Sequence, residues 1–194
     1  MWGRSSEWKR HRFYKVSKRA RAAYLILCLE EALKFYDKGN TEKWRWILKE
    51  LWGITSTQDI EEWVKRTCDA ATDEVLRYNS YQERIERYKK IDYWCELSEK
   101  EFCLLHALYR EGDPVLPVFS SLYDKVYDVI TLDWGDLEEP YTPSALPAID
   151  AAEKILIEQN IPLPQNQQAM DFLMHHHDKH YGKPFDGIQL SSIL

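Results

Sequence analysis

The sequence predicts an all-α protein, a single-domain bundle of about seven to nine helices. Three observations favour this class. Apolar residues recur at spacings of three and four along most of the chain, no alternating strand pattern is found, and 194 residues suffice for one ordinary domain with its own core. Because no internal repeat interrupts this pattern, we expect residues 1–194 to form one helical domain.

The longest helical pattern runs from Ser17 to Lys38 and carries two apolar stripes, so we expect this helix to be central, with Gly39 stopping it. Ser98 and Glu101 form a capping box that opens another helix, and Ser56 with Asp59 resembles a similar cap. A further short helix at 73–78 either stands alone or continues its predecessor. The main predicted helices are 17–38, 41–52, 60–71, 81–95, 99–109, 115–130, 144–159 and 165–180.

The composition places the protein in the cytoplasm. No apolar run approaches the roughly 20 residues of a membrane-spanning helix, and the N-terminus lacks the apolar core of a secretory signal. Cys28, Cys68, Cys95 and Cys103 form no Cys-x-x-Cys pair and lie within helical patterns. We therefore expect reduced, buried thiols and no membrane partner.

Charge is unevenly distributed. Residues 1–21 contain eight Lys or Arg residues and one Glu, a local charge of +7 that leaves −13 for the rest of a chain whose net charge is −6. The basic arm at 1–13 either contacts nucleic-acid phosphates or folds back on the acidic body. Because that body would repel a polyanion, folding back is the favoured interpretation.

Four of the six histidines lie in one stretch, MHHHDKHYG at 174–182. On a helix reaching residue 180, His176 and His180 are i, i+4 neighbours that could hold one metal ion. A third ligand is missing from that helix face, and histidines in a last helical turn also interact favourably with the helix dipole. We therefore expect no metal and no cofactor, with a less ordered tail at 181–194.

One set of residues suggests an enzyme. His106, the His177-Asp178 pair and Asp186 follow the residue order of all-α metal-dependent HD-type hydrolases, but their intervals do not fit that family. The chain has no Gly-rich phosphate loop and no Gly-x-Ser-x-Gly elbow. The carboxylate pairs at 30–31 and 61–62 are predicted to face solvent. The sequence thus predicts a protein that is not an enzyme.

The irregular segment at 131–143 combines a large aromatic residue with dense negative charge. Tryptophan is frequent at interface hot spots, and acidic rims steer basic partners. The alternative is a buried tryptophan beneath a solvated acidic loop. The predicted partner-binding residues are Asp133, Trp134, Asp136, Glu138 and Glu139.

One family resemblance is carried by the tryptophan pattern Trp44-x-Trp46-Ile-Leu-x-x-Leu51-Trp52-x-Ile54-Thr55, followed by Asp59-Ile60-x-x-Trp63. Residues 14–78 resemble the helical start of small all-α immunity proteins from bacterial polymorphic-toxin systems. The resemblance implies a non-enzymatic protein that binds and neutralises a cognate toxin domain. With the acidic body, it leads us to expect a basic protein as partner; a nucleic-acid-associated protein and a metal-dependent hydrolase are the alternatives.

Overall fold

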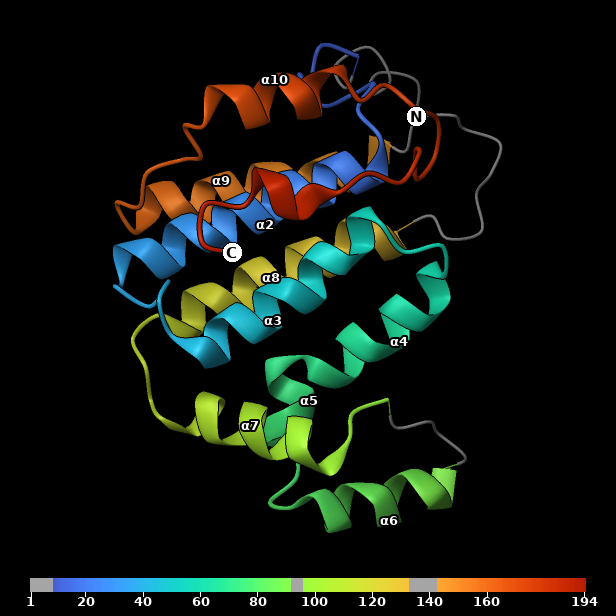
Figure 1. Cartoon of the computed structure of the whole chain (residues 1–194), viewed down its shortest axis with the longest axis vertical. Helices are drawn as coiled ribbons and strands as arrows, with labels where there is room; N and C mark the ends of the chain where they lie inside the picture. The colour runs from blue at the N-terminus through green and yellow to red at the C-terminus, as the bar shows by residue number, and fades with distance from the viewer. Residues whose placement is uncertain (1–8, 92–95, 133–142) are drawn as a thin grey trace.

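The computed structural model describes residues 9–91, 96–132 and 143–194. This part of the chain is all-α, which confirms the predicted fold class, and it contains nine α-helices and no strand (Figure 1). The helices are α2 (Lys18–Phe35), α3 (Glu42–Trp52), α4 (Ile60–Ala70), α5 (Thr72–Leu76), α6 (Tyr81–Ile91), α7 (Glu99–Arg110), α8 (Leu116–Thr131), α9 (Leu146–Glu158) and α10 (Gln167–His175). Three short 3-10 helices are η1 (Gly53–Thr55), η2 (Pro143–Ala145) and η3 (Gly187–Leu190).

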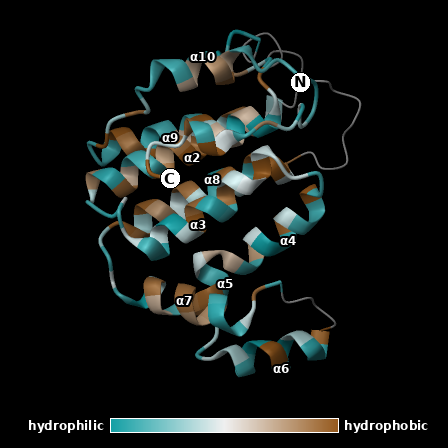
Figure 2. Cartoon of the chain, viewed as in Figure 1, coloured by the Kyte–Doolittle hydropathy of each residue, from teal (hydrophilic) through white to brown (hydrophobic). Residues whose placement is uncertain are grey.

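Helix α2 is the centre of the bundle, as its two apolar stripes predicted. It packs against α8, α9, α3 and α10, and fifteen of its eighteen residues are buried. Figure 2 shows hydrophobic residues gathered along α2 and α8 in the middle of the fold, whereas the outlying α6 is largely hydrophilic. A helix surrounded on several sides must be apolar nearly all round, which is why its sequence shows no single apolar face.

Helix α2 ends at Phe35, earlier than predicted. Asp37 adopts a left-handed conformation with φ 56°, and the N–H of Lys38 donates to the carbonyl of Leu33 at 2.7 Å. This backbone turn satisfies carbonyls that the last helical turn leaves open. The helix therefore stops before Gly39, and that glycine is not needed as its terminator.

Local capping signals gave one correct and one wrong prediction. The capping box of Ser98 and Glu101 is present and opens α7. In α4 the cap is Asp59 itself, whose carboxylate accepts from the N–H of Glu62 at 2.8 Å, and Ser56 closes η1 instead. An aspartate at the N-cap position satisfies the first free N–H groups directly, so no partner three residues earlier is required.

At the far end of the bundle, α6 is attached through a buried ion pair. The Arg84 guanidinium lies 2.8 Å from a carboxylate oxygen of Asp69, and both side chains are almost fully buried. Tyr88 bonds to both partners, and Arg84 also lies over the rings of Tyr88 and Phe102. A polar anchor of this kind fixes a helix that has few apolar residues of its own.

The segment 181–194, which we name the C-terminal strap, is packed on the bundle, contrary to the less ordered tail expected from the sequence. The N–H of Phe185 donates to the Thr55 carbonyl at 2.8 Å, and the N–H of Gly187 donates to Thr55 Oγ1 at 3.1 Å. The strap then runs as η3 between α10 and α3 (Figure 1).

The strap is also held by Glu30, whose side chain is fully buried in α2. Its carboxylate accepts hydrogen bonds from Trp52 Nε1 at 2.8 Å, Ser191 Oγ at 2.5 Å, and the N–H and Oγ of Ser192, both at 2.8 Å. The prediction that Glu30 faces solvent is therefore wrong. Glu31 beside it is half-buried and pairs with Lys34. The prediction is confirmed for the exposed carboxylates at 61–62.

The cysteines follow the prediction in part. Cys28 is buried and Cys68 is partly buried, whereas Cys103 on α7 is exposed, because it lies on the outer face of a helix at the edge of the fold. Cys95 lies outside the described residues. Within the described ranges, no helix has the length and apolar character needed to cross a membrane.

Candidate functional site

The histidine stretch does not form the helix face that would hold a metal ion. Helix α10 ends at His175, and His176 is its C-cap with φ −81° and ψ 71°. His180 lies beyond the helix with a positive φ of 53°. The predicted i, i+4 relation of His176 and His180 is therefore wrong. The physical reason is that the chain leaves the helix in order to satisfy donors on α2.

These donors are the free backbone N–H groups at the beginning of α2. The first N–H groups of a helix have no partner within it. Here three carbonyls of the histidine stretch accept hydrogen bonds from them. The three bonds run from Ser17 N to His176 O at 3.0 Å, from Lys18 N to His180 O at 3.0 Å, and from Arg19 N to Tyr181 O at 3.2 Å.

Three side chains at this junction have the composition of a catalytic triad. Ser17 Oγ lies 2.8 Å from His176 Nδ1, and His176 Nε2 lies 3.8 Å from a carboxylate oxygen of Asp178. However, Ser17 is only 1% exposed, and its Oγ already accepts from the N–H of Ala20 as the N-cap of α2. A hydroxyl in this position caps a helix and offers no open path to a substrate. The arrangement therefore connects the start of α2 to the end of α10.

The burial of His176 at this contact predicts that the stability of the protein depends on pH. Burial lowers the pKa of His176 below its ordinary value of 6.5, although Asp178 opposes the shift. A lowered pKa in the folded state means that the unfolded chain binds the proton more readily. The free energy of unfolding therefore has its full value above about pH 6.5 and falls as the pH drops towards 5. Chemical denaturation at several pH values should show this fall. His176→Asn should flatten it, whereas the exposed His177→Asn should retain the full slope.

The residues considered for an HD-type hydrolase are not brought together. His106 lies on α7, where it contacts the Tyr78 carbonyl at 3.1 Å and stacks on Phe102. Helix α7 is at the opposite end of the bundle from α10 and the stretch that follows it (Figure 1). Asp186 bonds to Gln189 on the strap. In the described ranges, no group of three or more His, Cys, Asp or Glu residues is placed to hold a metal ion.

The described part of the basic arm, residues 9–13, folds back on the body. His11 contacts Asp150 at 3.0 Å, Arg12 pairs with Glu153, and Phe13 is fully buried. The cations that follow are also used inside the fold, since the side chains of Lys18, Arg19 and Arg21 are buried and donate to backbone carbonyls. Folding back is the interpretation that the contacts confirm for these residues.

The predicted partner-binding residues Asp133, Trp134, Asp136, Glu138 and Glu139 lie outside the described residues. They stay a prediction. Leu132 precedes this segment in the described part of the chain. It is 39% exposed, and its carbonyl accepts a hydrogen bond from Lys18 Nζ. The 3-10 helix η2 follows the segment.

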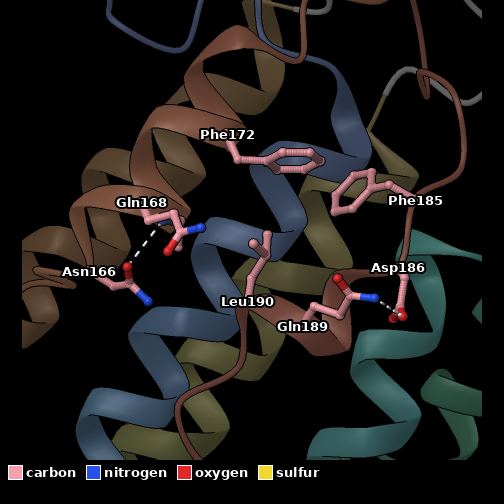
Figure 3. A pocket seen from close by; sticks show the side chains of 8 residues that line it. Asn166, Gln168, Phe172, Phe185, Asp186, Gln189 and Leu190 are labelled. Atoms are coloured by element: carbon pink, nitrogen blue, oxygen red, sulfur yellow. Dashed lines mark hydrogen bonds between the residues drawn. The ribbon is translucent and has the colours of Figure 1, made fainter.

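The strap and α10 enclose a pocket that sequence reasoning did not indicate (Figure 3). Its volume is about 420 Å³. Phe172 and Phe185 form an aromatic wall, with ring centroids 5.1 Å apart and an edge-to-face angle of 64°. The remaining lining residues are small, apolar or polar, with one carboxylate among them: Asn166, Gln168, Ala169, Asp186, Gln189 and Leu190.

The polar groups of this pocket are held in part by hydrogen bonds. Asn166 Oδ1 accepts from the N–H of Ala169 at 3.1 Å as the N-cap of α10, and Gln189 Nε2 donates to a carboxylate oxygen of Asp186 at 2.9 Å (Figure 3). The aromatic wall is supported by His176, whose ring centroid lies 4.8 Å from that of Phe185. The site therefore offers an aromatic wall, amide groups and one carboxylate.

No protein-family model, curated protein or solved structure matches this chain.

Proposed function

We propose that the protein is a non-enzymatic protein-binding module of the cytoplasm, an immunity protein that binds a basic toxin domain and neutralises it. The observation that carries the proposal is the distribution of charge between core and surface. Among the described residues, four cationic side chains are buried, Lys18, Arg19, Arg21 and Arg84, against two buried carboxylates, Glu30 and Asp69.

Removing more cations than anions from solvent leaves a surface with a larger negative excess than the net charge of −6 indicates. Such a surface steers a basic protein towards itself and raises the association rate. It equally disfavours a nucleic acid, whose phosphates would meet carboxylates. The acidic segment at 133–139 is already part of this net charge.

Contact area for such a partner is available on the described surface. Phe172 is 42% exposed and Ile188 is 41% exposed, and both belong to the region where α10 meets the strap. Exposed aromatic and aliphatic side chains beside a carboxylate are the composition of an interface core with a polar rim. This composition supports protein binding.

The test is to isolate a partner from the source cell with the full-length protein and to measure its binding kinetics by surface plasmon resonance. Reversing Glu138 and Glu139 to Lys should mainly slow association and weaken its salt dependence. Trp134→Ala should mainly accelerate dissociation, at a cost of about 2 kcal/mol or more.

The charge-reversed variant and Trp134→Ala serve as controls for each other, since one changes steering and the other changes contact. Capture of only acidic proteins, or of none, would contradict the proposed function. Unchanged rates for both variants with a basic partner would place the interface away from residues 133–139 and leave the function intact.

A further inference from the structure

We infer that the pocket between α10 and the strap receives an arginine side chain of the basic partner. The inference rests on the proposed function and specifies which chemical group of the partner is recognised and where. It is based on the lining of the pocket, in which Asp186 is the single charged residue, on the exposed ring of Phe172, and on the amide groups around them.

The shape and wall of the pocket fit a long side chain with a flat cationic end. Phe172 comes from α10 and Phe185 from the strap, and Figure 3 shows their rings side by side along one edge of the pocket, with Leu190 below them. An arginine stem can lie on Leu190 and the rings, and its guanidinium plane can stack on an aromatic face. At about 420 Å³, the pocket has room for one such side chain.

The hydrogen-bonding groups favour a donor-rich ligand. Asp186 uses one carboxylate oxygen to accept from Gln189, and its side chain is otherwise exposed at the rim. The nitrogen of the Gln189 amide is used on Asp186, which leaves its oxygen as a further acceptor, and Gln168 carries a second amide group at the pocket. Arginine presents five N–H donors in a planar arrangement, whereas lysine presents one compact ammonium group. Several acceptors beside an aromatic wall therefore select arginine.

Charge complementarity with Asp186 disfavours the opposite type of ligand. An anionic side chain would meet the carboxylate of Asp186 with no cation among the lining residues to compensate it. A purely apolar side chain would cover the carboxylate and the amides without satisfying them, which costs free energy. The carboxylate of Asp186 is also part of the acidic surface that attracts the basic partner as a whole.

The experiment uses two small probes on the full-length protein, N-acetyl-arginine methylamide and its neutral analogue N-acetyl-citrulline methylamide. Two-dimensional amide NMR follows a titration with each probe into the millimolar range. The arginine probe should shift the amide signals of Phe172, Asp186 and Gln189. The citrulline probe has the same shape without the charge, and it should shift them at least about threefold less at equal concentration.

Matched variants assign the effect to the pocket. Asp186→Asn should raise the Kd of the arginine probe about threefold or more, and Phe172→Ala about fivefold. Asp171→Asn is the control, because Asp171 is an exposed carboxylate on the same helix that does not line the pocket. It should leave the Kd unchanged. All three variants change exposed side chains and are expected to fold, which their unshifted distant amide signals would verify.

The outcomes separate this inference from the proposed function. Equal shifts with both probes, an equal effect of Asp171→Asn and Asp186→Asn, or no shift at the pocket would overturn the arginine site, even if a basic partner has been captured. Arginine-specific shifts that Asp186→Asn abolishes support the site. If no basic protein is then captured, the proposed function fails while the affinity of the pocket for arginine stands.

Discussion

Glu30→Ala should lower the free energy of unfolding by about 3–5 kcal/mol, because it removes the common acceptor of several buried or half-buried donors. Trp52 Nε1 and the N–H of Ser192 would lose their partner, and the two serine hydroxyls would have to reorient. Urea denaturation followed by tryptophan fluorescence measures the loss. Limited proteolysis should also show faster cleavage of the strap in the variant.

Glu31→Ala provides the matched control, since Glu31 is the next residue of α2 and makes a partly exposed ion pair with Lys34 at 2.7 Å. Such pairs contribute little, so this variant should stay within about 0.5 kcal/mol of the natural protein. Equal destabilisation by the two substitutions would show that Glu30 does not hold the strap.

Gly187→Ala should be destabilising by about 2–3 kcal/mol through overpacking. A methyl group at this position would lie 2.6 Å from Thr55 Oγ1 and 2.8 Å from Trp52 Cε3. Neither neighbour can move easily, because Trp52 is fully buried and Thr55 Oγ1 already bonds to the Trp52 carbonyl and to Gly187 N. Thermal unfolding should show a clearly lowered Tm.

Gly53→Ala is the control for Gly187→Ala. Gly53 belongs to η1, has helical dihedral angles of φ −51° and ψ −29°, and offers a new methyl group an ordinary contact of 3.6 Å with Trp63. Alanine fits that backbone and restricts the unfolded chain, so the substitution should be neutral or stabilising by up to about 1 kcal/mol. A Tm for Gly187→Ala close to that of Gly53→Ala would mean that the strap does not pack against Thr55.

Features encoded within one turn of helix could be predicted from the sequence. The capping box of Ser98 and Glu101 is such a case, because both partners of the interaction are three residues apart. The central position of α2 was also predictable, since only a helix surrounded by others carries apolar residues on two faces. These signals require no knowledge of what lies elsewhere in the chain.

The errors arise where distant segments meet. Nothing near His176 indicates that its carbonyl accepts from Ser17, 159 positions away in the sequence, and helical periodicity therefore extended α10 too far. Glu30 has a sequence context typical of a solvated face, and only the strap and Trp52 make its burial favourable. Tertiary contacts overrode the local preference in both cases.

The candidate site was not predictable for a similar reason. Phe172 lies on α10 and Phe185 lies on the strap, and no helical or strand periodicity relates the two positions. The pocket arises because the strap turns back along α10. Amide residues such as Gln168 and Gln189 carry no sequence signal for binding. What the sequence does indicate is the overall charge, which supports the class of partner but gives no location for it.

The capping of α2 by residues 176–181 has a consequence for biosynthesis. The central helix is synthesised well before the segments that satisfy its first N–H groups, at residues 176–181, and before Ser191 and Ser192, which bond to Glu30. Until then the nascent chain exposes the apolar faces of α2 and α3 and cannot close its core. We expect the core of this domain to close only after the segment up to residue 192 has left the ribosome.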